Sequence, residues 1–183
     1  QVESAPMPNE GYDIVFAGRL IKDKNVDILF QAFDSIAQQY DCTMGIIGDG
    51  PERESLTHQL TTLTHSDRVS LLGFLDDYEE VLGHMRSARV FASPSTREGF
   101  GITFAEAMAA DCIVVAADHP DSAAKEVIGD AGFLCEPTVE GVAAALEKAL
   151  SGVSRPVSPP ERALRFDWDV VSNQALQAYE SVV

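Results

Sequence analysis

Short apolar runs alternate along the chain with longer segments in which apolar residues recur at helical spacing. Continuous apolar runs of roughly four to eight residues are typical of strands that are buried on both faces of a sheet. The runs that fit this pattern are 12–17, 43–47, 69–74, 89–92, 112–117 and 132–135. The pattern therefore predicts about six strands.

The segments between these runs are predicted to be helices. The clearest is 26–40, where Val26, Leu29, Phe30 and Phe33 fall on one helical face. Further helices are expected at 52–64, 78–86, 102–110, near 126, at 139–150 and at 166–183. Alternating strands and helices predict an α/β fold: a Rossmann-like, doubly wound parallel sheet with helices on both faces.

The length of 183 residues suits one hydrophobic core. Residues 1–11 are polar and aperiodic, so we interpret them as the remnant of a linker. Residues 12–152 form the predicted Rossmann-like domain. Residues 153–183 are interpreted as a proline-marked connector followed by a terminal helix.

Residues 93–110 combine the features of a ligand-binding loop. The stretch leaves a predicted strand, turns at two glycines that flank Phe100, and enters an Ala-rich helix. Glycines let a ligand approach the backbone, and the free N–H groups of a helix N-terminus attract an anion. Glu98 precedes the turn, and Glu106 is expected about one turn inside the helix. Two carboxylates around an anion cradle suit a ligand with both phosphate and hydroxyl groups.

These residues carry a resemblance to a known family. The run P-S-x-x-E-G-F-G-x-x-x-x-E-A-M-A, which holds Glu98 and Glu106, resembles the E-x7-E signature of retaining nucleotide-sugar glycosyltransferases of the GT-B fold, family 4 (group 1). Gly18-Arg19-Leu20 followed by Lys24 resembles the G-R-L-x-x-x-K loop of the same family. The resemblance covers nearly the whole chain from Tyr12 onward.

The resemblance implies that the chain is the C-terminal, donor-binding half of a two-domain enzyme. A first residue that is not Met, Gln1, fits such a fragment. The whole enzyme is expected to transfer a hexose from a UDP- or GDP-sugar to a glycan or lipid acceptor in polysaccharide or glycolipid biosynthesis. It would act in the cytoplasm or at the cytoplasmic face of the membrane, with any membrane contact through the missing N-terminal domain. This half alone is expected to bind the donor without transferring it.

The family pattern also implies a role for each matching residue. Glu98 is the implied catalytic residue because the first Glu of the signature meets the transferred sugar, and Glu106 would hold the ribose hydroxyls. The remaining implied substrate contacts are Gly18, Arg19, Lys24, Leu75, Gly99, Phe100, Gly101 and Ile102. Two fixed cations can offset the charge of a departing diphosphate, so neither a metal nor another cofactor is expected.

Several positions keep two interpretations. Asp77 could accept hydrogen bonds from a guanine edge, or it could cap the helix that follows. Trp168 resembles an aromatic residue near the family's C-terminus, where the segment 153–183 is expected to pack back toward the missing N-terminal domain. We expect Trp168 to anchor packing there rather than bind a ligand. The loop 118–126 lacks the Gly-Gly-x-x-Glu run of many family members, which leaves its donor contact open.

Two other functions remain open beside the transferase. A sugar-nucleotide epimerase can share this architecture, although the Glu98, Glu106 and Gly18-Arg19-Leu20 matches follow the transferase pattern more completely. A binding module that kept the fold and lost catalysis is the second alternative.

The net charge excludes some classes of binding partner, and the cysteines are expected to be structural. The formal net charge of -16 argues against nucleic acid or an anionic membrane surface as a partner of this domain. The three cysteines are widely spaced in apolar settings, so buried reduced thiols are expected.

The same charge balance predicts a response to salt. Dense carboxylates with few lysines resemble proteins of salt-loving organisms, in which self-repulsion is screened because the Debye length falls to about 3 Å near 1 M salt. We expect the unfolding temperature to rise between dilute buffer and molar KCl. Thermal melts that show no gain would contradict this hypothesis.

Overall fold

The strands form one parallel sheet, as the alternating pattern predicts. The computed structural model describes residues 2–180. Its strands are β1 (Ile14–Ala17), β2 (Met44–Ile47), β3 (Val69–Gly73), β4 (Val90–Ser93), β5 (Ile113–Ala117) and β6 (Phe133–Cys135). They lie in the order β3-β2-β1-β4-β5-β6, and every neighbouring pair is parallel. The doubly wound Rossmann-like sheet is therefore confirmed.

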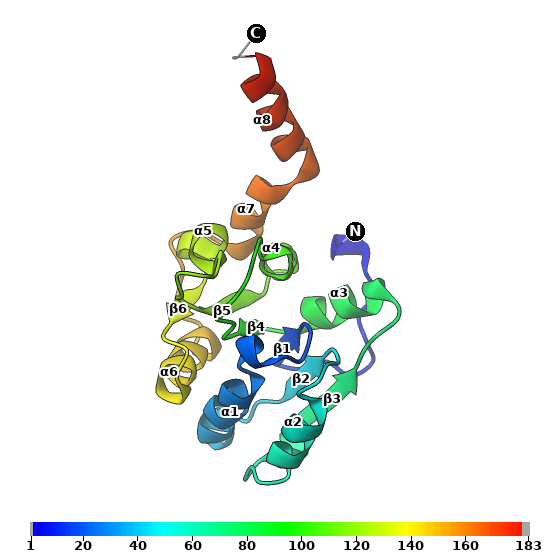
Figure 1. Cartoon of the computed structure of the whole chain (residues 1–183), viewed down its shortest axis with the longest axis vertical. Coiled ribbons are helices and arrows are strands. Elements are labelled where there is room, and N and C mark those ends of the chain that lie inside the picture. The colour runs from blue at the N-terminus through cyan, green and yellow to red at the C-terminus, as the bar shows by residue number, and fades with distance from the viewer. Residues whose placement is uncertain (1, 181–183) are drawn as a thin grey trace.

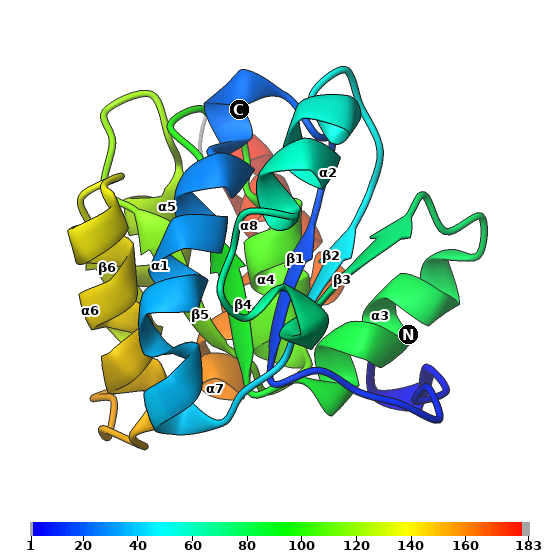
Figure 2. The same ribbon diagram turned by 90° about the horizontal axis from the view of Figure 1, so that it is seen from below.

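Helices cover both faces of the sheet (Figures 1 and 2). The α-helices are α1 (Val26–Tyr40), α2 (Arg53–Leu60), α3 (Tyr78–Ser87), α4 (Ile102–Ala109), α5 (Ala124–Ile128), α6 (Val139–Leu150), α7 (Pro159–Ala163) and α8 (Trp168–Glu180). Short 3-10 helices lie at Val2–Ser4, Lys22–Lys24, Ser66–Arg68, Gly129–Ala131 and Leu164–Phe166. One hydrophobic core joins the sheet to α1, α2 and α6, and a second joins it to α3, α4 and α5.

The side chains of strand β1 alternate between the two hydrophobic cores. Ile14 and Phe16 pack into the core beneath α1 and α6, whereas Val15 and Ala17 pack into the core beneath α3 and α4. Successive side chains of a strand point to opposite faces, so a strand covered on both sides needs apolar residues throughout. Buried apolar runs consequently mark the strands of this chain.

Two departures from the predicted elements have local causes. Helix α7 lies in the connector, where Ser158 accepts a hydrogen bond from the Glu161 N–H and Pro159 occupies the first helical turn. A serine cap followed by proline is typical of a helix N-terminus, but the prolines of this segment were interpreted as marking a connector without a helix. Strand β3 ends at Gly73, in the left-handed region at φ 77°, so Phe74 leaves the sheet.

The C-terminal helix makes little contact with the rest of the described structure. Helix α8 extends away from the rest of the structure (Figure 1), and the Trp168 side chain is 84% exposed. Trp168 therefore does not pack on this domain, and its expected packing against another domain stays a prediction. Phe166, just before α8, instead meets the ring of Phe100 edge-on at 6.4 Å between centroids. Residues 181–183 of the predicted terminal helix lie outside the described residues.

Two of the three cysteines are buried as predicted, and the third is partly exposed. Cys42 and Cys112 are buried, Cys135 is half-buried, and all three are free thiols. Burial raises the pKa of Cys112 to about 12 and that of Cys135 to about 11. These thiols are packing groups rather than reactive ones.

Gly48 permits close approach between the chain segments that leave β1 and β2. Its N–H donates to the Gly73 carbonyl at 2.7 Å, and its φ is 133°. A Cβ placed there would lie 1.9 Å from the carbonyl oxygen of Gly18. Only glycine fits this position, which brings the ends of β1, β2 and β3 together.

We expect Gly48→Ala to lower the free energy of unfolding by about 3 kcal/mol, because a backbone clash adds to an unfavourable φ. Gly152→Ala is the matched control: its φ is 73°, and a Cβ there meets no atom within 4 Å. It should cost only about 1 kcal/mol. Chemical denaturation measures both values, and equal losses would show that the close approach to Gly18 is unimportant.

Candidate functional site

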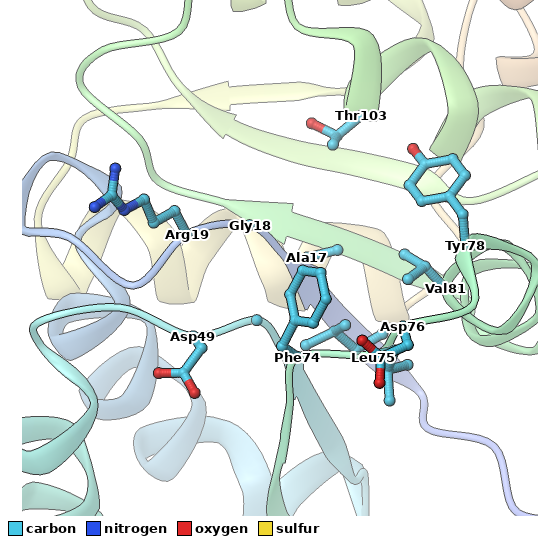
Figure 3. A pocket seen from close by; sticks show the side chains of 12 residues that line it. Ala17, Gly18, Arg19, Asp49, Phe74, Leu75, Asp76, Tyr78, Val81 and Thr103 are labelled. Carbon is cyan, nitrogen blue, oxygen red and sulfur yellow. The ribbon is translucent and has the colours of Figure 1, made fainter.

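A cleft opens at the carboxyl ends of the central strands. The strand order reverses between β1 and β4, because the chain after β1 enters α1 on one face and the chain after β4 enters α4 on the other. Open α/β sheets bind ligands at such a reversal. The cleft has a volume of about 510 Å³ and lies beside this point (Figure 3). Its lining residues are Ala17, Gly18, Arg19, Ile47, Gly48, Asp49, Phe74, Leu75, Asp76, Tyr78, Val81 and Thr103.

The cleft has an apolar floor and a few polar groups at its rim. Phe74 stands in it with 71% of its surface exposed, since it has left β3 and no other element within residues 2–180 covers it (Figure 3). Tyr78 begins α3, and Thr103 faces it from α4. An apolar cleft with few polar groups is typical of sites for small organic molecules.

The loop after β1 and the loop after β4 are joined beside the cleft. The Asn25 amide donates to the Pro94 carbonyl at 2.8 Å, and the Thr96 N–H donates to the Asp23 carbonyl at 2.9 Å. Asn25 adopts a left-handed conformation with φ 50°, which asparagine tolerates better than most residues. These contacts hold the charged side chains of the two loops together.

Lys24 and Glu98 form an ion pair at this junction. The Lys24 Nζ lies 2.5 Å from Glu98 Oε2, and the two side chains are only 17% and 18% exposed. The backbone of Glu98 is also fixed, because its N–H donates to the Asp121 carbonyl and its carbonyl accepts from the Ala123 N–H. Two residues from separate sequence motifs therefore meet, and the loop 118–126 supports one of them.

The glycine-rich loop ends where α4 begins. Gly101 caps α4 with φ 70°, and a Cβ there would lie 2.7 Å from the Phe104 ring. Phe100 and Ile102 are 61% and 58% exposed, so this loop presents apolar side chains to its surroundings. Glu106 lies about one turn inside α4, as predicted.

Glu106 is held by a residue that the sequence motifs did not single out. The Tyr78 hydroxyl donates to Glu106 Oε2 at 2.5 Å. Burial raises the pKa of Glu106, and the hydrogen bond from Tyr78 opposes that rise. Burial, together with this hydrogen bond and the negative charge of Glu106, raises the pKa of Tyr78. The phenol therefore keeps its proton near neutral pH and donates a hydrogen bond to the carboxylate.

The predicted site residues fall into three groups. Gly18, Arg19 and Leu75 line the cleft, and Arg19 is exposed at its rim. Lys24 and Glu98 form the ion pair, while Gly99, Phe100, Gly101, Ile102 and Glu106 lie along the loop and first turns of α4. Sequence reasoning missed Phe74, Tyr78 and Thr103, although Tyr78 directly follows the predicted helix cap at Asp77.

The chain is similar to a known protein family along most of its length. The family model described as glycosyl transferases group 1 matches residues 2–163. The chain belongs to this family of glycosyltransferases. Membership of the group 1 family agrees with the Rossmann-like sheet and with the placement of the cleft at its reversal point.

Individual relatives agree with the family. The phosphatidyl-myo-inositol mannosyltransferase of Mycolicibacterium smegmatis is 35% identical over 185 residues, which cover 96% of this chain and 46% of the relative. The N-acetylgalactosamine-N,N'-diacetylbacillosaminyl-diphospho-undecaprenol 4-alpha-N-acetylgalactosaminyltransferase of Campylobacter jejuni is 33% identical over 120 residues, covering 66% of this chain and 31% of the relative. The chain thus spans about half the length, or less, of these curated relatives.

Solved structures share the same fold. Anabaena HepE, in a complex with UDP and glucose, superposes with a TM-score of 0.75 and 26% identity over 94% of this chain and 49% of that chain. The pneumococcal O-GlcNAc transferase GtfA, in a complex with UDP and GlcNAc, gives a TM-score of 0.79 at 21% identity, over 98% of this chain and 38% of that chain.

Two further features are absent from the described part of the chain. No helix within residues 2–180 is long and apolar enough to cross a membrane. The same residues contain no group of three or more His, Cys, Asp or Glu side chains arranged to hold a metal ion.

Asp77 has a structural task at the cleft. Its carboxylate accepts a hydrogen bond from the Glu79 N–H at 2.9 Å and so caps α3. The cap orients the first helical residue, Tyr78, which lines the cleft. The capping interpretation of Asp77 is therefore confirmed.

We expect Asp77→Ala to lower the free energy of unfolding by about 1 kcal/mol, because it removes the acceptor for a helix N–H. Asp77→Asn should change the free energy of unfolding by only a few tenths of the Asp77→Ala loss, since asparagine caps helices as well as aspartate does. Denaturant unfolding measures both. Equal losses in the two variants would mean that the charge, and not the cap, stabilises α3.

Proposed function

We propose that this chain is the C-terminal, donor-binding domain of a retaining glycosyltransferase of family 4. The full enzyme would transfer a hexose from a nucleoside diphosphate sugar to a glycan or lipid acceptor. The observation that carries the proposal is the convergence of Lys24, Glu98 and the N-terminus of α4 beside an apolar cleft at the strand reversal. The base and ribose would occupy the cleft, and the diphosphate would lie toward the charged loops.

Each charged group has a part in the proposed transfer. The bond between the anomeric carbon and the diphosphate oxygen breaks, the acceptor oxygen bonds to that carbon on the same face, and the acceptor proton passes to the departing diphosphate. Arg19 and Lys24 would offset the charge that develops on the diphosphate. Glu98 would position the sugar, and the loop from Gly99 to Ile102 would offer backbone N–H groups to the donor.

The missing half would supply the acceptor site. A group 1 enzyme with two Rossmann-like domains would bind its acceptor on the N-terminal domain, and the exposed apolar side chains of α8 would face that domain. Membrane contact, if the acceptor is a lipid, would also belong there, and the enzyme would work on the cytoplasmic side. The isolated chain would bind the donor and transfer nothing.

Neither alternative function has comparable support. The two curated relatives and GtfA are transferases by name, and none of them is an epimerase. Lys24 and Glu98 are paired at low exposure, and a charged pair of this kind is costly to desolvate. A module without catalysis would have no need of such a pair.

Titration of the chain with UDP, GDP and ADP tests the proposal. We expect saturable binding at micromolar to millimolar concentration, about 4 to 8 kcal/mol, that selects one base. Glu106→Ala should weaken this binding roughly 10- to 100-fold, because a charged acceptor is lost. Calorimetry in molar KCl and in dilute buffer provides the measurement.

Glu140→Ala is the matched control, since Glu140 is an exposed residue of α6 on the opposite face of the sheet. It should leave the affinity unchanged. Binding of none of the nucleotides would contradict the proposal, and so would sugar transfer by this chain alone that depends on Glu98.

A further inference from the structure

The hydrogen bond between Tyr78 and Glu106 sets what this part of the site can recognise. The two residues are 28 positions apart and come from different helices, the first residue of α3 and the second turn of α4. The separation of 2.5 Å is that of a hydrogen bond between a hydroxyl and a charged carboxylate. Its direction is known, since only the phenol carries a proton.

Tyr78 and Glu106 together have free hydrogen-bond acceptors but no free donor. A phenol has one proton and oxygen lone pairs, and the Tyr78 proton is directed to Glu106. The carboxylate keeps the acceptor capacity of Oε1, and no other hydrogen bond within residues 2–180 involves the Glu106 side chain. A ligand therefore meets two neighbouring oxygen acceptors and no donor.

Such a pair selects the chemistry of its ligand. Phosphate and carboxylate groups offer acceptors only and would be repelled by the Glu106 charge. Two hydroxyls on adjacent carbons supply one donor for each acceptor. The ribose of a nucleotide carries that vicinal diol at its 2′ and 3′ positions.

Tyr78 is the member of the pair that reaches the cleft. It lines the cleft and is 51% exposed, whereas Glu106 is half-buried and is not one of the lining residues. Figure 3 shows its ring at the rim between Val81 and Thr103, with the hydroxyl directed toward α4. A bound ligand in the cleft would meet the phenol oxygen before it meets the carboxylate.

We propose that Tyr78 is a second ribose contact, accepting a hydrogen bond from one ribose hydroxyl while Glu106 accepts one from the other. The inference rests on the proposed function, because the cleft must hold a nucleotide. It adds a specificity residue for ribonucleotides outside the E-x7-E motif.

The test compares Tyr78→Phe with the wild-type chain by calorimetry. The probes are the nucleoside diphosphate that binds best, its 2′-deoxy and 3′-deoxy analogues, and its sugar conjugate. Loss of one neutral hydrogen bond should weaken ribonucleotide binding roughly 3- to 10-fold. For the deoxy analogue that lacks the partner hydroxyl, the two proteins should agree within roughly twofold.

Tyr40→Phe, at the far end of α1, is the control for loss of a phenol and should bind like the wild type. Thermal melts establish that each variant is folded. Equal weakening of the ribonucleotide and both deoxy analogues, or no weakening at all, overturns the inference alone. A loss seen only with the sugar conjugate, and not with the free diphosphate, overturns it in favour of the transferred sugar. A wild-type chain that binds no nucleotide overturns the proposed function and this inference together.

Discussion

The reversal of strand order between β1 and β4 is the constraint on which the site depends. Neighbouring parallel strands that send their chains to opposite faces leave a crevice that no helix can cover. Everything of functional interest lies along that crevice: the loop after β1, the loop after β4 and the first turns of α3 and α4. A sheet wound in one direction only would have brought α1 and α4 to the same face and closed this opening.

Ion pairing and backbone contacts then fix the two loops. Lys24 and Glu98 neutralise one another at low exposure, and the contacts from Asn25 to Pro94 and from Thr96 to Asp23 hold their backbones. Preorganised charges of this kind suit the stabilisation of a departing diphosphate, since little reorganisation is needed during the reaction.

The fold was largely predictable because strands that are buried on both faces of the sheet are continuous apolar runs in the sequence. Runs such as Val90–Ser93 and Ile113–Ala117 are apolar throughout, and α1 carries its apolar residues on one face. Errors arose where local chemistry competed with that pattern. Helix α7 was hidden by prolines that in fact begin it.

The sequence by itself determined the α/β class, the strands and the eight-position spacing of Glu98 and Glu106, because periodicity and local spacing are properties of neighbouring residues. Only the tertiary structure decided which side chains meet. Lys24 and Glu98 are 74 positions apart, and Tyr78 and Glu106 are 28 positions apart. Such pairs depend on strand order and on the angle at which helices leave the sheet. Tyr78 has no motif around it, so its contact with Glu106 became visible only when α3 and α4 were placed side by side.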